Sequence, residues 1–362
     1  MGGVFILCFG MHWFPDDMIL SSNMIAVGTI AFNVLVIHSG TMISTAFLRV
    51  QKKGAALCLI STLILFLVVC FGLRPVIGKE LSLLAPGSIV GGGASCAIAS
   101  RWVVETAPRV SVFPWLIFMF QGLFSVPLCC FALKRESALI LDRLHRGEIK
   151  PPAGPPKEEV QGGLVGRIPA RFKTTAYYLG IIMTVSFVNR MAVDWVNGQF
   201  GLDLNVNMTA LILGFLLGHL GLMDKAPLYK SDSYGLLLLG LMGLMANTLA
   251  TTIKNGTVFA ILGLLPPLLL CMAVGTAVMA LCGALLGKRF GMSPWRGMAM
   301  CVNCITGFPV NGVLVERYSA MGGNPMEQAV LKSQLGPVLG IGTMLISNGI
   351  SIFIVSILVS FI

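Results

Sequence analysis

The sequence predicts an all-α polytopic membrane protein, built as an inverted repeat of two helical halves that each contain a re-entrant hairpin. The first observation is composition, because 56% of the 362 residues are hydrophobic and only 11% are charged. Soluble domains carry roughly 25% charged residues, so a chain this apolar lacks the polar side chains that cover a surface facing water. The second observation is a set of long uncharged runs, and the third is a pair of similar glycine-rich segments.

Most of the uncharged runs are near or above the length of about 18 residues that a helix needs to cross the hydrocarbon core. They are continuous rather than alternating, which favours helices over the strands of a membrane barrel. We expect full crossings over residues 24–47, 55–73, 110–133, 176–196, 208–222, 235–253, 257–287 and 335–362. Residues 1–14 are apolar but span only about 21 Å of helix, so we expect them to continue a longer helix that begins upstream.

Residues 134–173 differ from the rest of the chain, with nine Lys and Arg residues, five Asp and Glu residues and a proline-rich stretch. Basic residues are retained on the cytoplasmic side of a membrane, so we interpret this segment as a cytoplasmic connector. The chain then divides into a first transmembrane repeat over residues 1–133, N-terminally incomplete, and a second over residues 174–362. Alternating the crossings from this anchor places 19 basic residues in cytoplasmic loops and five in outer loops, which supports the assignment.

Two segments of about twenty residues resemble each other. One begins at Gly87 and ends at Glu105, and the other begins at Gly297 and ends at Glu316. Both are rich in Gly, Ser and Cys, and both precede a long apolar helix. By the count of crossings, one enters from outside and the other from the cytoplasm. This is the inverted repeat that is typical of secondary transporters, and we predict re-entrant hairpins over residues 84–104 and 297–315.

The hairpins also contain the candidate binding residues. Glycine costs about 1 kcal/mol relative to alanine in a helix, so a run of glycines favours a break. A broken helix at membrane depth exposes N–H groups that can bind a carboxylate and carbonyl groups that can bind Na+. The candidates for substrate or ion binding are Gly91, Gly92, Gly93, Ser95, Asn303, Thr306, Gly307 and Asn311. The alternative is that these small residues serve only to let helices pack closely.

Other polar and sulfur-containing residues are weaker candidates for a direct functional role. Arg190 and Asp194 are four residues apart on one predicted helix, where we expect a structural ion pair, and His38 is expected to bridge two helices. Ten cysteines lie mostly in apolar runs, so no structural disulfides are expected. Cys301 and Cys304 have no nearby partners for a metal site. The chain has no nucleophile with a nearby base, no HExxH and no P-loop, so we predict neither an enzyme nor an ATP-driven pump.

The residues of the two hairpins resemble the bacterial sodium/glutamate symporter family. The best stretch is Ala-Met-Cys-Val-Asn-Cys-Ile-Thr-Gly-Phe-Pro-Val-Asn-Gly over residues 299–312, with Val-Glu-Arg-Tyr over 315–318, Gln-Leu-Gly-Pro over 334–337 and the pair Ser347-Asn348. The first half is similar through Gly2-Gly3, Ala31-Phe32, residues 87–97 and Glu105. The chain departs from the family where a Ser-Gly-Gly-His-Gly type of run is replaced by residues 91–95, and a Gly-His-Cys-Gly pattern by residues 301–304.

The resemblance implies ten spans in two inverted halves, a homodimer in the inner cell membrane, and Na+-coupled uptake of glutamate or a related small carboxylate. Na+ would be the coupling ion, with no other cofactor. One alternative is a citrate-like organic-anion carrier. Another is a non-transporting membrane subunit of a Na+-pumping complex, and an orphan sensor or channel is a third. The net charge of +10 does not indicate a nucleic-acid partner, because the basic residues lie in loops between apolar runs rather than on one face.

Overall fold

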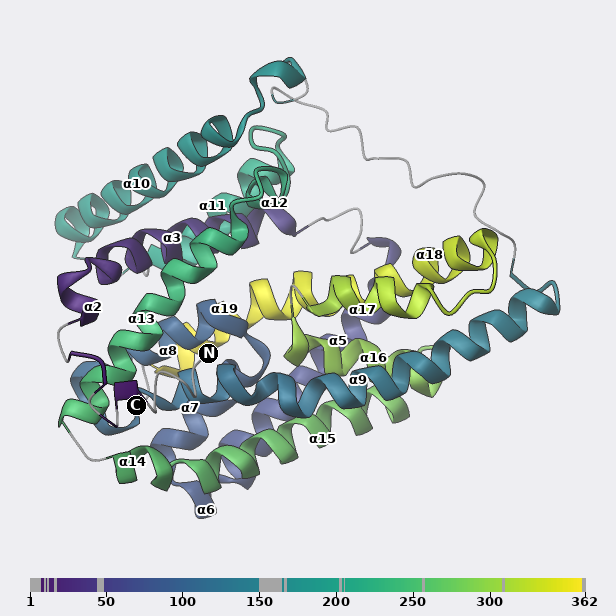
Figure 1. Ribbon diagram of the computed structural model, residues 1–362, viewed down its shortest axis with the longest axis horizontal. Coiled ribbons are helices and arrows are strands. Elements are labelled where there is room, and N and C mark those ends of the chain that lie inside the picture. Colours follow the sequence, from purple (N-terminus) through teal and green to yellow (C-terminus); the bar gives the residue numbers. More distant parts are fainter. Residues whose placement is uncertain are drawn as a thin grey trace.

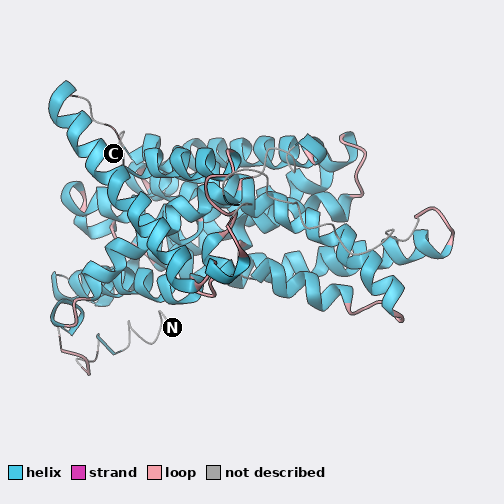
Figure 2. Cartoon of the chain, turned by 90° about the horizontal axis from the view of Figure 1, so that it is seen from above, coloured by secondary structure: helices cyan, strands magenta, loops and turns pink. Residues whose placement is uncertain are grey.

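The fold of the protein is known from a computed structural model. The structure describes residues 8–9, 11, 13–15, 18–43, 49–149, 165, 168–201, 204, 206–255, 258–307 and 310–359. Every element of this described part is helical, and no strand occurs in it. Figure 2 shows helices throughout, joined by loops.

The helices of the first half are α2 (Met18–Ser21), α3 (Met24–Met42), α5 (Lys52–Leu67) with its π-helical continuation η1 (Val68–Gly72), α6 (Arg74–Ile77), α7 (Lys79–Val90), α8 (Gly92–Thr106), the 3₁₀ turn η2 (Pro108–Val110) and α9 (Phe113–His145). Those of the second half are η4 (Ala170–Phe172), α10 (Thr175–Phe200), α11 (Val206–His219), α12 (Pro227–Lys230), α13 (Tyr234–Asn255), α14 (Val258–Gly263), α15 (Leu265–Arg289), α16 (Pro294–Thr306), α17 (Val310–Ser319), α18 (Pro325–Ile341), the π-helical η5 (Gly342–Ile350) and α19 (Ser351–Val359).

Seven helical segments of the described chain are long and apolar enough to cross a membrane, so the protein is a multi-pass helical membrane protein. They are Met24–Met42, Lys52–Gly72, Pro108–His145, Thr175–Phe200, Tyr234–Thr251, Ile261–Arg289 and Pro325–Leu358. Each overlaps a crossing predicted from the sequence. The predicted crossing over residues 208–222 is instead the shorter helix α11 of 14 residues, about 21 Å long. The predicted partial crossing over residues 1–14 falls mostly outside the described residues.

The helices form two packed groups. The first group contains α3, α10, α11, α12 and α13, and the second contains α5, α7, α8, α9 and α15 to α19. Figure 1 shows α10, α11 and α3 on one side of the molecule and α9 and α15 on the other. The groups meet where α3 contacts η5 and α8, where α13 contacts α8, and where α11 contacts α19.

Close backbone approach between helices explains some of the glycines. A methyl group on Gly214 of α11 would lie 2.2 Å from the Ile37 carbonyl oxygen of α3, and one on Gly297 would lie 2.1 Å from the Gly283 carbonyl oxygen. Small residues at such contacts let membrane helices pack by van der Waals contact. Gly297, which leads the second glycine-rich segment, therefore serves packing between α15 and α16.

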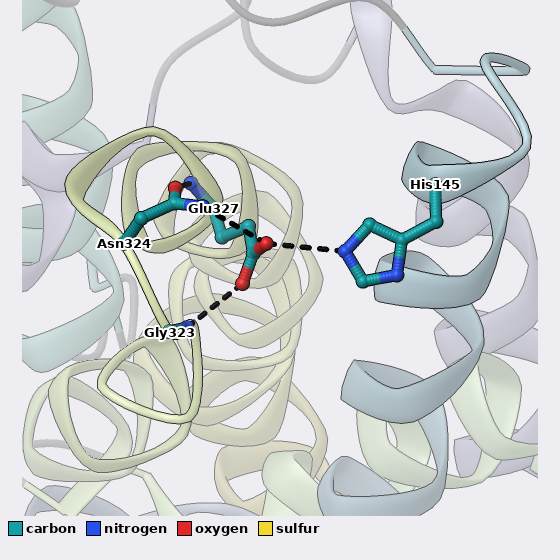
Figure 3. A network of polar contacts seen from close by, with 4 residues as sticks. All are labelled: His145, Gly323, Asn324 and Glu327. Carbon is teal, nitrogen blue, oxygen red and sulfur yellow. Dashed lines mark hydrogen bonds and ion pairs between the residues drawn. The ribbon is translucent and has the colours of Figure 1, made fainter.

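The C-terminal part of α9 contacts the chain at two places. One is the start of α16, and the other is the start of α18, which follows α17. Ser293, the N-cap of α16, donates its hydroxyl to the buried Glu136 carboxylate on α9. Nearer the end of α9, the His145 Nε2 atom lies 3.1 Å from Glu327 Oε1 in the first turn of α18 (Figure 3). The start of α16 and the chain that follows α17 therefore lie close to the same end of α9.

The predicted connector over residues 134–173 is partly helical. Its first residues continue α9 as far as His145, and its last residues include the turn η4. Residues 150–164 lie outside the described part of the chain. Lys173, at the end of the segment, pairs with the buried Asp224 at an N–O distance of 3.2 Å.

Candidate functional site

The first glycine-rich segment is broken into two helices at Gly91. Helix α7 ends at Val90 and α8 begins at Gly92, whose φ of +59° is favoured only for glycine. The Cys96 thiol lies 3.6 Å from the Ser88 carbonyl oxygen although eight residues separate them. In a continuous helix residues eight apart are separated by about 12 Å, so the chain turns sharply between α7 and α8.

The second glycine-rich segment is also broken. Helix α16 ends at Thr306, Gly307 has a φ of +63°, and α17 begins at Val310. The Gly307 N–H donates to the Asn303 carbonyl at 3.0 Å, which closes the last turn of α16. Pro309 lies outside the described residues. Both glycine-rich segments are therefore interrupted helices.

A cavity of about 260 Å³ lies between the two breaks and the helices that surround them. Five of the eight residues predicted to bind substrate or ion line this cavity, namely Gly91, Gly92, Gly93, Thr306 and Gly307. The other lining residues are Leu35, Ser39, Phe118, Met119, Gln121, Gly122, Tyr234, Leu238, Leu241, Val310 and Ser347. Leu35, Ser39, Tyr234, Leu238 and Leu241 come from the α3 and α13 group, so the cavity lies at the junction of the two helix groups.

Ser347 joins the two breaks. A methyl group on Gly92 would lie 3.5 Å from the Ser347 hydroxyl oxygen, and a methyl group on Gly307 would lie 3.4 Å from it. Ser347 is buried and belongs to η5, a nine-residue π-helical segment. π-Helical turns inside membrane helices alter the hydrogen-bond ladder and are frequent at functional sites. Three irregular stretches of backbone therefore converge on one hydroxyl group.

Asn303 and Asn311 lie outside the cavity lining and share a neighbour on the last crossing segment. The Asn303 amide donates to the Leu339 carbonyl and, at 3.2 Å, to the Thr343 hydroxyl. The Asn311 amide donates to the same hydroxyl at 3.1 Å. The Oδ1 atom of Asn303 is buried and has no hydrogen-bond partner. A buried acceptor without a donor is costly, so this oxygen is available to a cation or a polar ligand.

Ser95 has a different place from the other candidates. Its hydroxyl donates to the Ser351 hydroxyl at 3.0 Å, and the Ser351 hydroxyl donates to the Ser347 carbonyl at 2.8 Å. A methyl group on Gly91 would lie 2.1 Å from the Ser95 hydroxyl oxygen, so Gly91 leaves room for this side chain. Ser95 thus links α8 to α19 behind the cavity rather than lining it.

Four polar residues of the cavity lining were not predicted as site residues from the sequence, namely Ser39, Gln121, Tyr234 and Ser347. Gln121 is buried in α9, and its Oε1 atom has no hydrogen-bond partner. Gln121 could have been found from the sequence, because it is an amide within an uncharged run. Ser347 was noted in the sequence only as part of the polar pair Ser347-Asn348. Ser39 and Tyr234 carry no sequence signal, because their place in the site depends on how α3 and α13 pack against the breaks.

The other polar and sulfur-containing residues singled out in the sequence lie outside this cavity. The Arg190 Nε atom lies 3.8 Å from Asp194 Oδ2, which confirms the predicted i,i+4 pair. His38 is buried against the rings of Tyr229 and Tyr234, and its Nδ1 atom accepts from the Leu228 N–H at 3.4 Å. All ten cysteines are free. The described residues contain no group of three metal-binding side chains.

The comparison with known proteins is negative. No protein-family model matches the chain, and no curated protein matches it. The site must therefore be interpreted from its own chemistry.

The cavity is lined by apolar side chains, hydroxyl groups, amides and glycine backbone. Backbone at membrane depth is tolerated outside regular helices only where it is buried in protein or lines a wet cavity. Helix α8 begins at the cavity, so its first N–H groups and the positive end of its dipole favour an anionic group there. Carbonyl, amide and hydroxyl oxygens nearby provide ligands for a hard cation. The arrangement suits binding of a small polar solute and has no acid–base pair for catalysis among its lining residues.

Proposed function

We propose that the protein is a secondary active transporter that carries glutamate or a related small carboxylate together with Na+. The observation that carries the proposal is the convergence of the breaks at Gly91–Gly92 and Gly307, with the π-helical segment at Ser347, on one cavity. In secondary transporters, discontinuous helices place half-helix N-termini on anionic substrates and unwound carbonyls on coupling ions.

We further propose that both broken segments are re-entrant hairpins in two inverted halves. The short Cys96–Ser88 contact supports a reversal of the chain at the first break. The anchors of α16 and α18 on the same end of α9 support a second reversal, since α16 starts and α17 finishes near that end. Packing of α3 on α13 and of α5 on α15 supports the repeat, because each pair consists of helices that precede the broken segments in the same order.

The proposed coupling ion binds beside the cavity, near Asn303. Its unpaired Oδ1 atom supplies one oxygen ligand, and Asn311 and Thr343 lie within the same hydrogen-bonded cluster. The substrate carboxylate binds at the start of α8. We assign the protein to the inner cell membrane, as a homodimer, on the resemblance of its hairpins to the sodium/glutamate symporters.

The cavity lining favours transport over the subunit of a Na+-pumping complex. Such a subunit requires a membrane-buried carboxylate on the path of the ion. The lining residues of the cavity include hydroxyl and amide groups but neither Asp nor Glu.

Uptake by purified protein in proteoliposomes tests the proposal. The panel consists of labelled L-glutamate, L-aspartate, succinate and citrate, each measured with and without an inward Na+ gradient. Empty liposomes and a sodium ionophore serve as controls. We expect at least one substrate to accumulate only with the gradient. The absence of gradient-dependent accumulation for the whole panel would refute the symporter.

A further inference from the structure

A second, larger cavity of about 410 Å³ contains charged side chains. It lies between α8, which contributes Arg101 and Trp102, and α10, which contributes Arg190 and Asp194. Asn33 of α3 lines it as well. Its volume is in the range of 300–1,000 Å³ that is typical of small-molecule sites.

The two cavities follow one another along the same two helices. On α8, Gly93 lines the first cavity and Arg101 lines the second, which corresponds to about 12 Å of helix. On α3, Ser39 lines the first cavity and Asn33 the second, a separation of about 9 Å. The second cavity is therefore separated from the broken helices by about two helical turns along α8 and along α3.

The charge of the second cavity is positive, since its lining residues include two arginines and one aspartate, whereas the lining of the first cavity carries no charged side chain. Guanidinium groups bind carboxylates through two parallel hydrogen bonds, with better geometry than an ammonium group. Two arginines from different helices of one cavity can therefore hold the carboxylate of an incoming anion.

The ion pair already present is weak enough to be replaced. Arg190 and Asp194 are 58% and 66% exposed, and their closest charged atoms are 3.8 Å apart. Exposed pairs of this kind are stabilised only weakly, because water solvates both charged groups. An incoming carboxylate at the same guanidinium group therefore competes with Asp194 at little cost.

We propose that this cavity, here called the arginine cavity, captures the carboxylate of the anionic substrate before it reaches the broken helices. Arg101 and Arg190 hold the anion, and Asp194 occupies Arg190 when the cavity is empty and limits the affinity. This inference rests on the proposed transport function and adds to it a first binding site and its chemistry.

Arginine substitutions test the capture step by their effect on the apparent KM for uptake. Arg101→Gln and Arg190→Gln are each expected to raise the KM for a gradient-dependent panel substrate about three- to fivefold at low ionic strength, as the loss of one exposed charge pair predicts. The maximal rate stays the same, because the broken helices are unchanged. Arg109→Gln is the matched control, since Arg109 is an exposed arginine beyond the end of the same helix and does not line the cavity.

The dependence of the KM on salt distinguishes an electrostatic role of the arginines from a purely structural one. With the Na+ gradient constant and choline chloride added, the Debye length falls from about 30 Å at 0.01 M to about 3 Å at 1 M ionic strength. The KM values of wild type and Arg101→Gln should converge as salt rises. A difference that persists unchanged at high salt overturns the electrostatic capture.

Asp194 separates capture from helix stability by the sign of its effect. Asp194→Asn frees Arg190 and is expected to lower the KM about two- to threefold, opposite to Arg190→Gln. If the pair only stabilised α10, both substitutions would impair uptake in the same direction, and the proposal would be wrong. If wild type transports but both arginine variants match Arg109→Gln, only the arginine cavity is refuted. If wild type shows no gradient-dependent uptake, the transport function and the inference built on it both fail.

Discussion

Gly92 and Gly307 lie beside the same side chain, although they belong to different halves of the chain. A methyl group on either glycine would come within 3.5 Å and 3.4 Å, respectively, of the Ser347 hydroxyl oxygen. Both glycines also have positive φ angles, +59° and +63°. The two interrupted helices and the π-helical segment of the last crossing therefore form one structural unit.

Alanine at either glycine should impair transport more than it impairs folding. A residue with a Cβ atom in the left-handed region costs about 1–2 kcal/mol, and its methyl group would narrow the cavity beside Ser347. We expect Gly92→Ala and Gly307→Ala to lower gradient-driven uptake at least tenfold, measured in proteoliposomes with equal amounts of protein.

Gly201 provides the matched control for these two substitutions. Its φ is +62°, and no atom lies within 4 Å of the position that its methyl group would take. Gly201→Ala therefore introduces the same backbone strain without touching the cavity. If it reduces uptake as much as Gly92→Ala does, strain alone accounts for the loss and the cavity has no part in it.

The Ser347 hydroxyl is expected to contact the transported solute or its ion. Ser347→Ala removes one oxygen without adding volume, so the loss is that of a hydrogen bond to a charged group, about 1.5–3 kcal/mol. The apparent affinity for substrate or Na+ in uptake should fall at least tenfold. Ser333→Ala, on the same crossing but bonded back to the Val330 carbonyl at 2.8 Å, should leave both affinities unchanged. Equal values for the two variants would remove Ser347 from the site.

Asn303 is expected to control the dependence on Na+. Asn303→Ala removes the unpaired Oδ1 atom and also leaves the Leu339 carbonyl without its amide donor. Because the latter costs about 1–3 kcal/mol of stability, uptake must be compared at equal amounts of folded protein. The Na+ concentration for half-maximal uptake should rise several-fold. Asn197→Ala, which removes a half-buried amide on α10 that is hydrogen-bonded to the Leu204 backbone, should leave it unchanged. A Na+ curve that coincides with that of wild type would place the cation elsewhere.

Glu327 should affect stability and leave transport intact. Its carboxylate accepts from the Gly323 N–H at 2.8 Å and lies 3.1 Å from the His145 ring, while the Asn324 side chain caps α18 by accepting from the Glu327 N–H (Figure 3). Helix-capping interactions of this kind stabilise the first turn of a helix. We therefore expect Glu327→Ala to lower the thermal unfolding temperature by a few degrees.

The control for this substitution is Glu80→Ala, which removes an exposed acidic residue in the first turn of α7. It should shift the unfolding temperature less than Glu327→Ala does. Uptake kinetics of both variants should match those of wild type. A large loss of transport in Glu327→Ala at full stability would show that this network has a part in the transport cycle.

The positions of the breaks were visible in the sequence because helix propensity is a local property. A run of three glycines at 91–93 and the pattern around Gly307 weaken a helix wherever it lies, and both helices are interrupted there. Hydropathy located the seven long apolar helices for the same reason, since a crossing needs a continuous run of apolar residues. The limit of this reasoning is α11, because the crossing predicted over residues 208–222 is itself shorter than the length of about 18 residues that a crossing needs, and the helix there has 14 residues.

By itself, the sequence determined that the protein is a helical membrane protein, where its helices weaken and which residues at those points offer polar groups. Only the tertiary structure decided that Ser347 lies against both breaks, that Ser95 faces Ser351 instead of the cavity, and that Arg101 shares a cavity with Arg190. The physical reason is that composition and propensity act within a few residues of chain. The meeting of side chains from distant helices is set by close packing across the whole bundle.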